Sequence, residues 1–381
     1  MADSTGTAPL NVGIIGYGLS ATIFQIPFIA TTSSLKLYSI LQRNPNASPS
    51  ATRDHPELQH YTTLESFLAD PSLHVVVIST PPQTHFAFAQ AALEAGKHVF
   101  VEKPFVPSVA EAEALIKLSR DRSRKICVYQ NRRWDSDFLT VRKLLADGTL
   151  GRVVEFETHF DRFRLSAATN WKGTLGMSQG GTVLFDLGTH LLDQVYVLFG
   201  LPSSIYAKFA VQRTGELLSA QNWPGGADAD PDPEPDSATL HLFYAATGTT
   251  AVVRMGVASA EVKQPRFWVR GTKGSYRKHG LDTQEPQLRA GMKTSDAGFG
   301  LEGPEWHGTL TTVGDDGALS ERPWPNVAPP QTYAKIYELF GAALQGREPD
   351  VPVPAEQARD VLRIIEAAKE SARTGREVAL S

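Results

Sequence analysis

Short apolar runs alternate with longer amphipathic stretches over the first third of the chain. The runs predict buried strands, because strands covered on both faces read as continuous apolar segments. The stretches between them place apolar residues at three- and four-residue spacing, as helices do. The predicted strands span 11–16, 35–41, 74–80, 97–104 and 125–131, and the predicted helices span 19–32, 63–70, 83–96 and 108–122. This alternation predicts an α/β fold with a doubly wound parallel sheet.

After about residue 132 the pattern changes to alternating apolar and polar positions. Segments 151–164, 238–257 and 266–280 read as strands with one covered face, and the last two contain turn signals typical of hairpins. Helical spacing recurs in four segments, 138–148, 181–200, 331–346 and 354–375. We expect an α+β unit built on a large, mostly antiparallel open sheet.

The change of pattern divides the 381 residues into two expected domains, 1–131 and 132–381. The acidic, proline-rich stretch 224–237 is expected to be a solvated loop. A net charge of −4 gives no electrostatic reason to expect nucleic acid or a membrane as partner. The single Cys127 excludes an intrachain disulfide, and no apolar run approaches the ~20 residues that span a bilayer. The start of the chain lacks signal-peptide features, so we expect a cytoplasmic protein.

The first predicted strand runs into the sequence GYGLSA, residues 16–21. Gly16 would allow a tight turn, Gly18 would let a pyrophosphate approach the backbone, and Ala21 would let the following helix pack closely. Leu19 lies within the same loop. Because this motif opens a series of strand–helix units, it favours a dinucleotide-binding Rossmann domain. The alternative is a glycine-rich turn that binds nothing.

The end of the second predicted strand bears on which dinucleotide is bound. NAD-binding domains usually place a carboxylate there, on the ribose 2′-hydroxyl. Here Gln42, Arg43 and Asn44 follow the strand, and the next carboxylate is Asp54. Arg43 would pair with a 2′-phosphate, so the sequence favours NADP over NAD. The alternative is that Arg43 is a solvated surface residue.

Two stretches carry candidate chemistry. Lys103 lies in VEKP at the carboxyl end of a predicted strand, the edge where α/β sheets bind ligands. Asp186 and His190 are four residues apart in a predicted helix, so the carboxylate would orient the imidazole as a general base. The alternatives are a surface lysine and a buried polar pair. No third ligand completes a metal site at a recognisable spacing, so no metal is expected.

The stretches VISTPPQTHFAFAQAALEAGKHVFVEKP, YQNRRWDSDF and GGTVLFDLGTHLLD follow the glycine loop in this order. Together they resemble the Gfo/Idh/MocA oxidoreductases, the family of glucose–fructose oxidoreductase and inositol dehydrogenase, over about residues 10–378. NRRWDSDF, FDRF and DLGTHLLDQ look closest to the NADP-dependent scyllo-inositol dehydrogenase-like branch. The resemblance implies hydride transfer at a sugar or cyclitol CH–OH carbon, and a homodimer or homotetramer formed through the second sheet.

The resemblance also implies residue roles. Lys103, Asp186 and His190 match the catalytic residues of the family, and Asp186 and His190 also face substrate. The positions that match its dinucleotide site are Thr80, Pro81, His85 and, beside the nicotinamide, Glu102 and Lys103. The positions expected to contact substrate are Arg132 and, more weakly matched, Asp161, Arg162 and Trp171. Pro82 departs from the pattern, because an asparagine is common there.

Other functions remain open at this stage. Within enzymes, an aldose 1-dehydrogenase acting on xylose or galactose has the same fold, and its distinguishing contacts are scattered over loops. Outside enzymes, some members of the fold are sensors that bind the dinucleotide without turnover. Sensors of that kind lack the catalytic lysine, whereas this chain retains Lys103 together with Asp186 and His190. The sequence therefore favours an enzyme.

Overall fold

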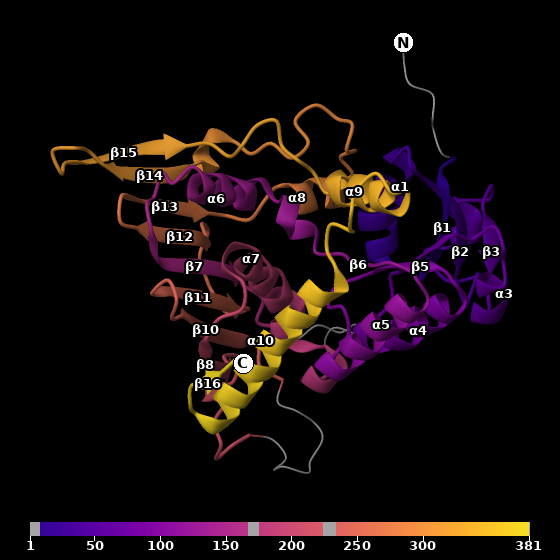
Figure 1. Cartoon of the computed structure of the whole chain (residues 1–381), viewed down its shortest axis with the longest axis horizontal. Helices are drawn as coiled ribbons and strands as arrows, with labels where there is room; N and C mark the ends of the chain where they lie inside the picture. Colours follow the sequence, from indigo (N-terminus) through magenta and orange to yellow (C-terminus); the bar gives the residue numbers. More distant parts are fainter. Residues whose placement is uncertain (1–7, 167–174, 224–233, 381) are drawn as a thin grey trace.

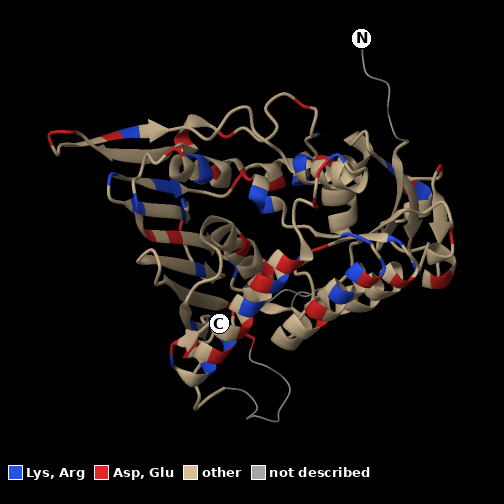
Figure 2. Cartoon of the chain, in the orientation of Figure 1, with Lys and Arg blue, Asp and Glu red and all other residues tan. Residues whose placement is uncertain are grey.

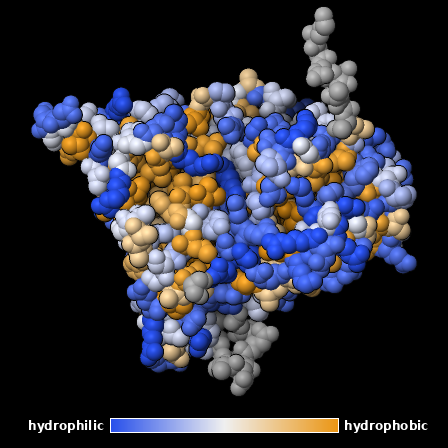
Figure 3. All heavy atoms as spheres, in the orientation of Figure 1, coloured by the Kyte–Doolittle hydropathy of each residue, from blue (hydrophilic) through white to orange (hydrophobic). Residues whose placement is uncertain are grey.

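The computed structural model describes residues 8–166, 175–223 and 234–380. Two sheets lie next to each other, and the long helix α10 (Ala355–Thr374) runs between the two halves (Figure 1). Lys and Arg positions are interspersed with Asp and Glu positions along α10 (Figure 2), and hydrophilic residues lie on this part of the visible face (Figure 3). Within the described ranges, no helix combines the length and the apolar composition needed to cross a membrane.

The first sheet has six strands in the order β3-β2-β1-β4-β5-β6, and every neighbouring pair is parallel. This is the strand order of dinucleotide-binding α/β domains, so the predicted doubly wound sheet is confirmed. The strands are β1 (Leu10–Ile15), β2 (Leu35–Leu41), β3 (Gln59–Tyr61), β4 (Val75–Ile78), β5 (His98–Val101) and β6 (Ile126–Val128). The helices are α1 (Ile26–Thr31), α2 (Ala51–Asp54), α3 (Leu64–Leu68), α4 (His85–Glu94) and α5 (Val109–Asp121).

The second sheet has ten strands, and its main path runs β15-β14-β13-β12-β7-β11-β10-β8-β16, with β9 paired to β8. Among the described strands, β7–β11 is the one parallel pair, so the expected large, mostly antiparallel sheet is confirmed. Its strands are β7 (Val153–Asp161), β8 (Ser204–Val211), β9 (Glu216–Leu217), β10 (Ser237–Tyr244), β11 (Thr249–Gly256), β12 (Pro265–Gly271), β13 (Gly274–His279), β14 (Gly308–Val313), β15 (Leu319–Trp324) and β16 (Val378–Ala379). The other helices are α6 (Ser136–Ala146), α7 (Thr189–Phe199), α8 (Gln284–Arg289) and α9 (Ala334–Leu344).

Helices α7 and α10 pack on one face of this sheet, and none of the described helices packs on the other face, called here the open face. Side chains of β7 alternate between the two faces, so Phe156 is buried while Glu155 and Glu157 lie on the open face. Arg270 of β12 bridges these two carboxylates at 2.8 and 3.0 Å. The expected homodimer or homotetramer through this sheet stays a prediction.

The end of the chain returns to the first sheet. Helix α9 packs on α1, and α10 packs on α5 and β6. The Tyr337 ring of α9 stacks on Phe28 and Phe100, with ring centroids 5.7 and 5.0 Å apart. The C-terminal helices therefore join the two halves, and the proposed boundary after residue 131 stays a prediction.

A buried ion pair fixes α7 to the segment that connects the two sheets. Arg133 donates from Nε and Nη2 to the two oxygens of Asp193 at 2.7 and 2.6 Å, and its Nη1 donates to Gln357 of α10 at 2.7 Å. Both partners of the pair are buried. Removing one partner of such a pair leaves an uncompensated charge in a site closed to water.

Arg133→Met is therefore expected to lower the free energy of unfolding by about 3–5 kcal/mol. Burial already raises the pKa of Asp193 against the opposing charge of Arg133. A raised carboxyl pKa favours the protonated folded form, so the deficit should shrink as the pH falls from 8 to 5. Denaturant titrations at both pH values measure this. The double variant Arg133→Met/Asp193→Leu is the control and should recover most of the loss; a loss below about 1 kcal/mol in the single variant would contradict the assignment.

Candidate active site

The glycine loop has the space that a dinucleotide requires. Gly16 follows β1 with φ +95°, and its N–H donates to Leu41 O at 3.0 Å. A Cβ on Gly16 would lie 2.4 Å from Ser79 O, whereas a Cβ on Gly18 would meet no atom within 4 Å. Gly16 is thus required by the turn, and Gly18 leaves open space in front of the backbone. Leu19 is exposed, and Ala21 is buried. These features fit the pyrophosphate of a dinucleotide.

Glu102, the residue before Lys103, is hydrogen-bonded to the end of the glycine loop and to the helix that follows it. The helix after the loop begins with a π-helical turn, Ala21–Gln25. Glu102 Oε1 accepts from Ser20 Oγ and, at 2.7 Å, from Gln25 Nε2. Its other oxygen accepts from the Lys103 N–H at 3.2 Å. The position of the glycine loop is therefore tied to the position of Lys103.

His85 holds the ends of β4 and β5 together. Its Nε2 lies 2.9 Å from Thr80 O, and its Nδ1 lies 2.9 Å from Pro104 O. The Thr80 hydroxyl is hydrogen-bonded to Thr84, whose hydroxyl donates to Pro81 O at 2.7 Å. Because His85 is fully buried, it lies behind the expected dinucleotide site and supports its loops, and it is not on the wall. Burial lowers its pKa, which favours the neutral ring.

Arg43 follows β2 in a loop shaped by the side chain of Gln42. The Gln42 amide accepts from Ala51 N and donates to Pro49 O, both at 2.8 Å. Arg43 itself is exposed, and no carboxylate of the described ranges pairs with it. The next carboxylate, Asp54, accepts from the Tyr17 hydroxyl at 3.0 Å. The structure therefore leaves a cation, and no available carboxylate, directly after β2.

Lys103 and Asp186 meet across the two halves of the molecule. Lys103 Nζ donates to the main-chain O of Asp186 at 2.7 Å and lies 3.1 Å from its Oδ1. The Lys103 side chain is 15% exposed and that of Asp186 is 31% exposed. Asp186 lies in a π-helical turn, Leu184–Gly188, that leads into α7. Such turns are frequent at functional sites.

His190 lies in the first turn of α7, four residues after Asp186, as the sequence predicted. It is buried, and its ring centroid lies 6.5 Å from that of Phe160 at the end of β7. The chain enters this helix through Thr182, whose φ of +69° is strained for a non-glycine residue, and through Gly181, where a Cβ would lie 1.9 Å from Leu175 O. Lys103 and Asp186 are therefore in contact across the two halves, and His190 lies four residues further along the helix that Asp186 leads into.

Two arginines stack on Phe160. The guanidinium carbons of Arg132 and Arg162 lie 5.0 and 4.8 Å from its ring centroid. Arg132 also donates to Asp135 Oδ2 at 3.1 Å and to Glu285 Oε2 of α8. Burial alone would raise the pKa of Glu285, but the nearby arginines lower it to about 2. Glu285 is therefore ionised throughout the physiological range.

Two of the expected substrate residues do not join this group. Asp161 lies on the open face of the second sheet, the face opposite to Phe160, since neighbouring residues of a strand point to opposite faces. Its Oδ2 lies 3.6 Å from His159 Nδ1 and 3.5 Å from Arg254 Nε. The expectation that Asp161 contacts the substrate beside Phe160 is therefore wrong, because its side chain points to the opposite face of the sheet. Trp171 lies outside the described residues.

Sequence reasoning missed Glu285 and Phe160. Glu285 lies on a six-residue helix far along the chain from its partner Arg132, and no local pattern connects the two. Phe160 reads as an ordinary buried strand position, although its ring neighbours two guanidinium groups and the His190 imidazole. Only the folded arrangement identifies either residue.

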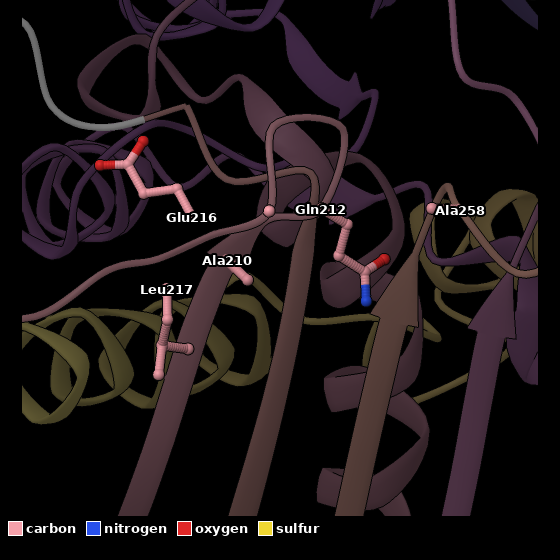
Figure 4. Close-up of a pocket in the computed structure, with 6 residues that line it drawn as sticks. Ala210, Gln212, Glu216, Leu217 and Ala258 are labelled. Atoms are coloured by element: carbon pink, nitrogen blue, oxygen red, sulfur yellow. The ribbon is translucent and has the colours of Figure 1, made fainter.

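A separate hollow of about 400 Å³ lies at the ends of β8, β9 and β11 (Figure 4). Its lining residues are Ala210, Gln212, Gly215, Glu216, Leu217 and Ala258. Gln212 lies near Asp161, since the Gln212 and Asp161 side-chain oxygens are 3.3 and 3.1 Å from a Cβ built on Gly256. The hollow contains none of the residues that gather around Lys103.

Substitution by alanine is expected to have different effects at Gly16 and Gly18, because the two positions differ in the space around a Cβ. Gly18→Ala should fold like the wild type, because its Cβ meets no atom, yet weaken NADPH binding by about tenfold or more, because the methyl group fills the approach of the pyrophosphate. Gly16→Ala should lose stability as well, given its positive φ and the Ser79 carbonyl. Fluorescence titration with NADPH and thermal unfolding separate the two effects. Unchanged NADPH affinity in Gly18→Ala would rule out this loop as the binding site.

Comparisons with known proteins agree with this geometry. Residues 10–130 match "Oxidoreductase family, NAD-binding Rossmann fold", and residues 142–380 match "Oxidoreductase family, C-terminal alpha/beta domain". Relatives include the Bacillus subtilis scyllo-inositol 2-dehydrogenase (NADP(+)) IolW, 33% identical over 97% of this chain and 96% of that protein. An uncharacterized oxidoreductase of Schizosaccharomyces pombe, C115.03, is 36% identical over 98% of this chain and 100% of its own length.

Solved structures give the same result. The putative oxidoreductase yvaA of Bacillus subtilis superposes with a TM-score of 0.86 at 30% identity, over 99% of this chain and 100% of that chain. The YPO2259 putative oxidoreductase of Yersinia pestis superposes with a TM-score of 0.83 at 35% identity, over 98% and 97%. With both family regions matched in order along one chain, this protein belongs to the Gfo/Idh/MocA family of oxidoreductases.

Proposed function

We propose that this protein is an NADP-dependent dehydrogenase that oxidises a CH–OH group of a sugar or cyclitol, or reduces the corresponding ketone. One observation carries the proposal: the Lys103 ammonium, from the end of β5, meets Asp186 at the start of the helix that carries His190. A cation and an imidazole directed at one place suit a hydroxyl that must lose its proton. The name of the IolW relative, a scyllo-inositol 2-dehydrogenase, supports the substrate class.

The cofactor assignment rests on the loop after β2. Arg43 is exposed there, and Asp54 is engaged by Tyr17. A 2′-phosphate would gain a charge-assisted contact from Arg43, whereas a carboxylate at this position would repel it. The NADP dependence in the IolW relative's name agrees with this preference.

The chain's own groups have distinct tasks in the mechanism. The residues around Gly16, Gly18 and Arg43 would hold the dinucleotide, and Glu102 keeps that loop in register with Lys103. When bound, the nicotinamide accepts or returns a hydride. His190 takes the proton of the substrate hydroxyl, and Asp186 orients the site. Lys103 stabilises the negative charge that develops on the substrate oxygen.

Lys103→Met and His190→Asn should each lower kcat by about 10²–10⁴-fold, since one removes oxyanion stabilisation and the other the general base. The KM for NADP⁺ should change much less, because neither substitution touches the glycine loop. Initial rates of NADP⁺ reduction, with scyllo-inositol, myo-inositol, xylose, glucose and galactose as substrates, measure both constants. Retention of wild-type turnover in Lys103→Met would refute the role given to this lysine.

Arg43→Ala should raise the KM for NADP⁺ by about 10- to 100-fold, the worth of one charge-assisted contact, and leave the KM for NAD⁺ nearly unchanged. Arg53→Ala, on α2 in the same region, is a matched loss of one exposed cation. The proposal requires that the ratio of the KM for NADP⁺ to the KM for NAD⁺ rise in Arg43→Ala and stay unchanged in Arg53→Ala. A preference for NAD⁺ in the wild-type protein would argue against the cofactor assignment.

A further inference from the structure

Arg162 belongs to a group of side chains around the Phe160 ring, called here the Phe160 wall, which consists of Arg132, Phe160, Arg162 and His190. Arg162 follows β7 directly, and its N–H donates to Gly256 O at 2.9 Å. Residues two apart in an extended chain share a face, so Arg162 points to the same side as Phe160. Its guanidinium carbon lies 4.8 Å from the Phe160 ring centroid, and the same ring neighbours His190.

The other cation of this group, Arg132, already forms ion pairs within the protein. Its side chain is 5% exposed and is held by Asp135 and Glu285. The second oxygen of Glu285 accepts from Arg289 Nε at 2.9 Å. Asp135 also accepts from the Tyr333 hydroxyl at 2.9 Å. Both carboxylates of this group are thus engaged by partners other than Arg162.

Arg162 differs from Arg132 in its contacts. Arg132 is held by two carboxylates, Asp135 and Glu285, whereas Arg162 forms no ion pair with either of them. Within the described ranges, the Arg162 guanidinium makes no side-chain hydrogen bond and no ion pair, and its contact is with the Phe160 ring. Burial lowers the pKa of Arg162, and the charges of Glu285 and Asp186 oppose that shift. A cation withdrawn from water without a partner is unfavourable, so an anionic ligand would stabilise it.

We propose that Arg162, and not Arg132, anchors the substrate, and that it does so through a carboxylate carried by a polyhydroxylated substrate such as a uronic acid. This inference rests on the proposed function and narrows its substrate class. The planar fork of a guanidinium matches the two oxygens of a carboxylate. Arg162 is a single guanidinium without an ion pair in the described ranges, and one carboxylate would give it a charge-assisted, bidentate partner. The hydroxyl to be oxidised then lies toward Lys103 and His190.

Matched neutral and acidic sugars test this substrate class. Initial rates of NADP⁺ reduction are compared for D-glucose against D-glucuronate and for D-galactose against D-galacturonate. We expect a higher kcat/KM for the acid in at least one pair. Arg162→Met should lower the acid-to-neutral ratio of kcat/KM by about 10- to 100-fold, the worth of a charge-assisted contact, and Arg162→Lys should restore part of it. Arg164→Met, which removes an exposed cation two residues away, should leave the ratio unchanged.

A second readout keeps the inference separate from the proposed function. Calorimetric titration of D-glucuronate and D-galacturonate into the NADPH-loaded protein should show binding that Arg162→Met weakens at least tenfold. A preference for the neutral sugars, or an equal loss for both members of a pair in Arg162→Met, would overturn the carboxylate assignment and leave the dehydrogenase proposal intact. If no sugar reduces NADP⁺, the proposed function fails, and the titration still decides whether Arg162 binds a carboxylate. No detectable binding of either acid would overturn the inference.

Discussion

The contact between Lys103 and Asp186 is the point on which the site depends, because it joins two separately built halves. Lys103 lies two residues after β5 of the parallel sheet, and Asp186 lies in the π-helical turn that leads into α7 of the second half. The ammonium is bonded to both the carbonyl and the carboxylate of Asp186, so its position follows that of α7. On the other side, Glu102 and His85 fix the neighbouring backbone to the glycine loop and to β4. The reacting groups therefore have little freedom to move apart.

Two consecutive arginines show how one short segment serves both stability and function. Arg132 turns toward the site, where it fixes Glu285 and stacks on Phe160. Arg133 turns the other way and clamps Asp193, three residues after His190, in a buried bidentate pair. Arg133 thus fixes the helix that carries His190, while Arg132 fixes Glu285 and packs on Phe160 beside His190. The Phe160 wall can discriminate between substrates only if its charges are held in fixed positions.

Local patterns predicted the fold class and most of the first sheet, and they singled out Lys103 and Asp186, which the structure brings into contact. The buried strands and the glycine loop are visible in sequence, and so is the cap at Ser108, whose hydroxyl accepts from Glu111 N at 3.2 Å. The strand β3 of the first sheet was missed, and so were β8, β9, β14, β15 and β16 of the second sheet. β3, β9 and β16 are only two or three residues long and β15 is exposed, whereas β8 and β14 alternate between buried and partly exposed positions and were not recognised. The orientation of Asp161 was wrong because alternation in a strand does not reveal which face the helices cover. The pairing of Glu285 with Arg132 could not be predicted from the sequence, since the two residues meet only in the folded chain.

The most direct measurement of the central claim follows the hydrogen that reduces the cofactor. The reaction with the polyol that reduces NADP⁺ fastest is run in D₂O, and the NADPH formed is analysed by NMR at C4 of the nicotinamide. Direct transfer from the substrate carbon, with His190 taking only the hydroxyl proton, predicts NADPH with no solvent deuterium at C4. Deuterium at that carbon would show that the transferred hydrogen exchanges with water, and it would contradict the mechanism assigned to Lys103, Asp186 and His190.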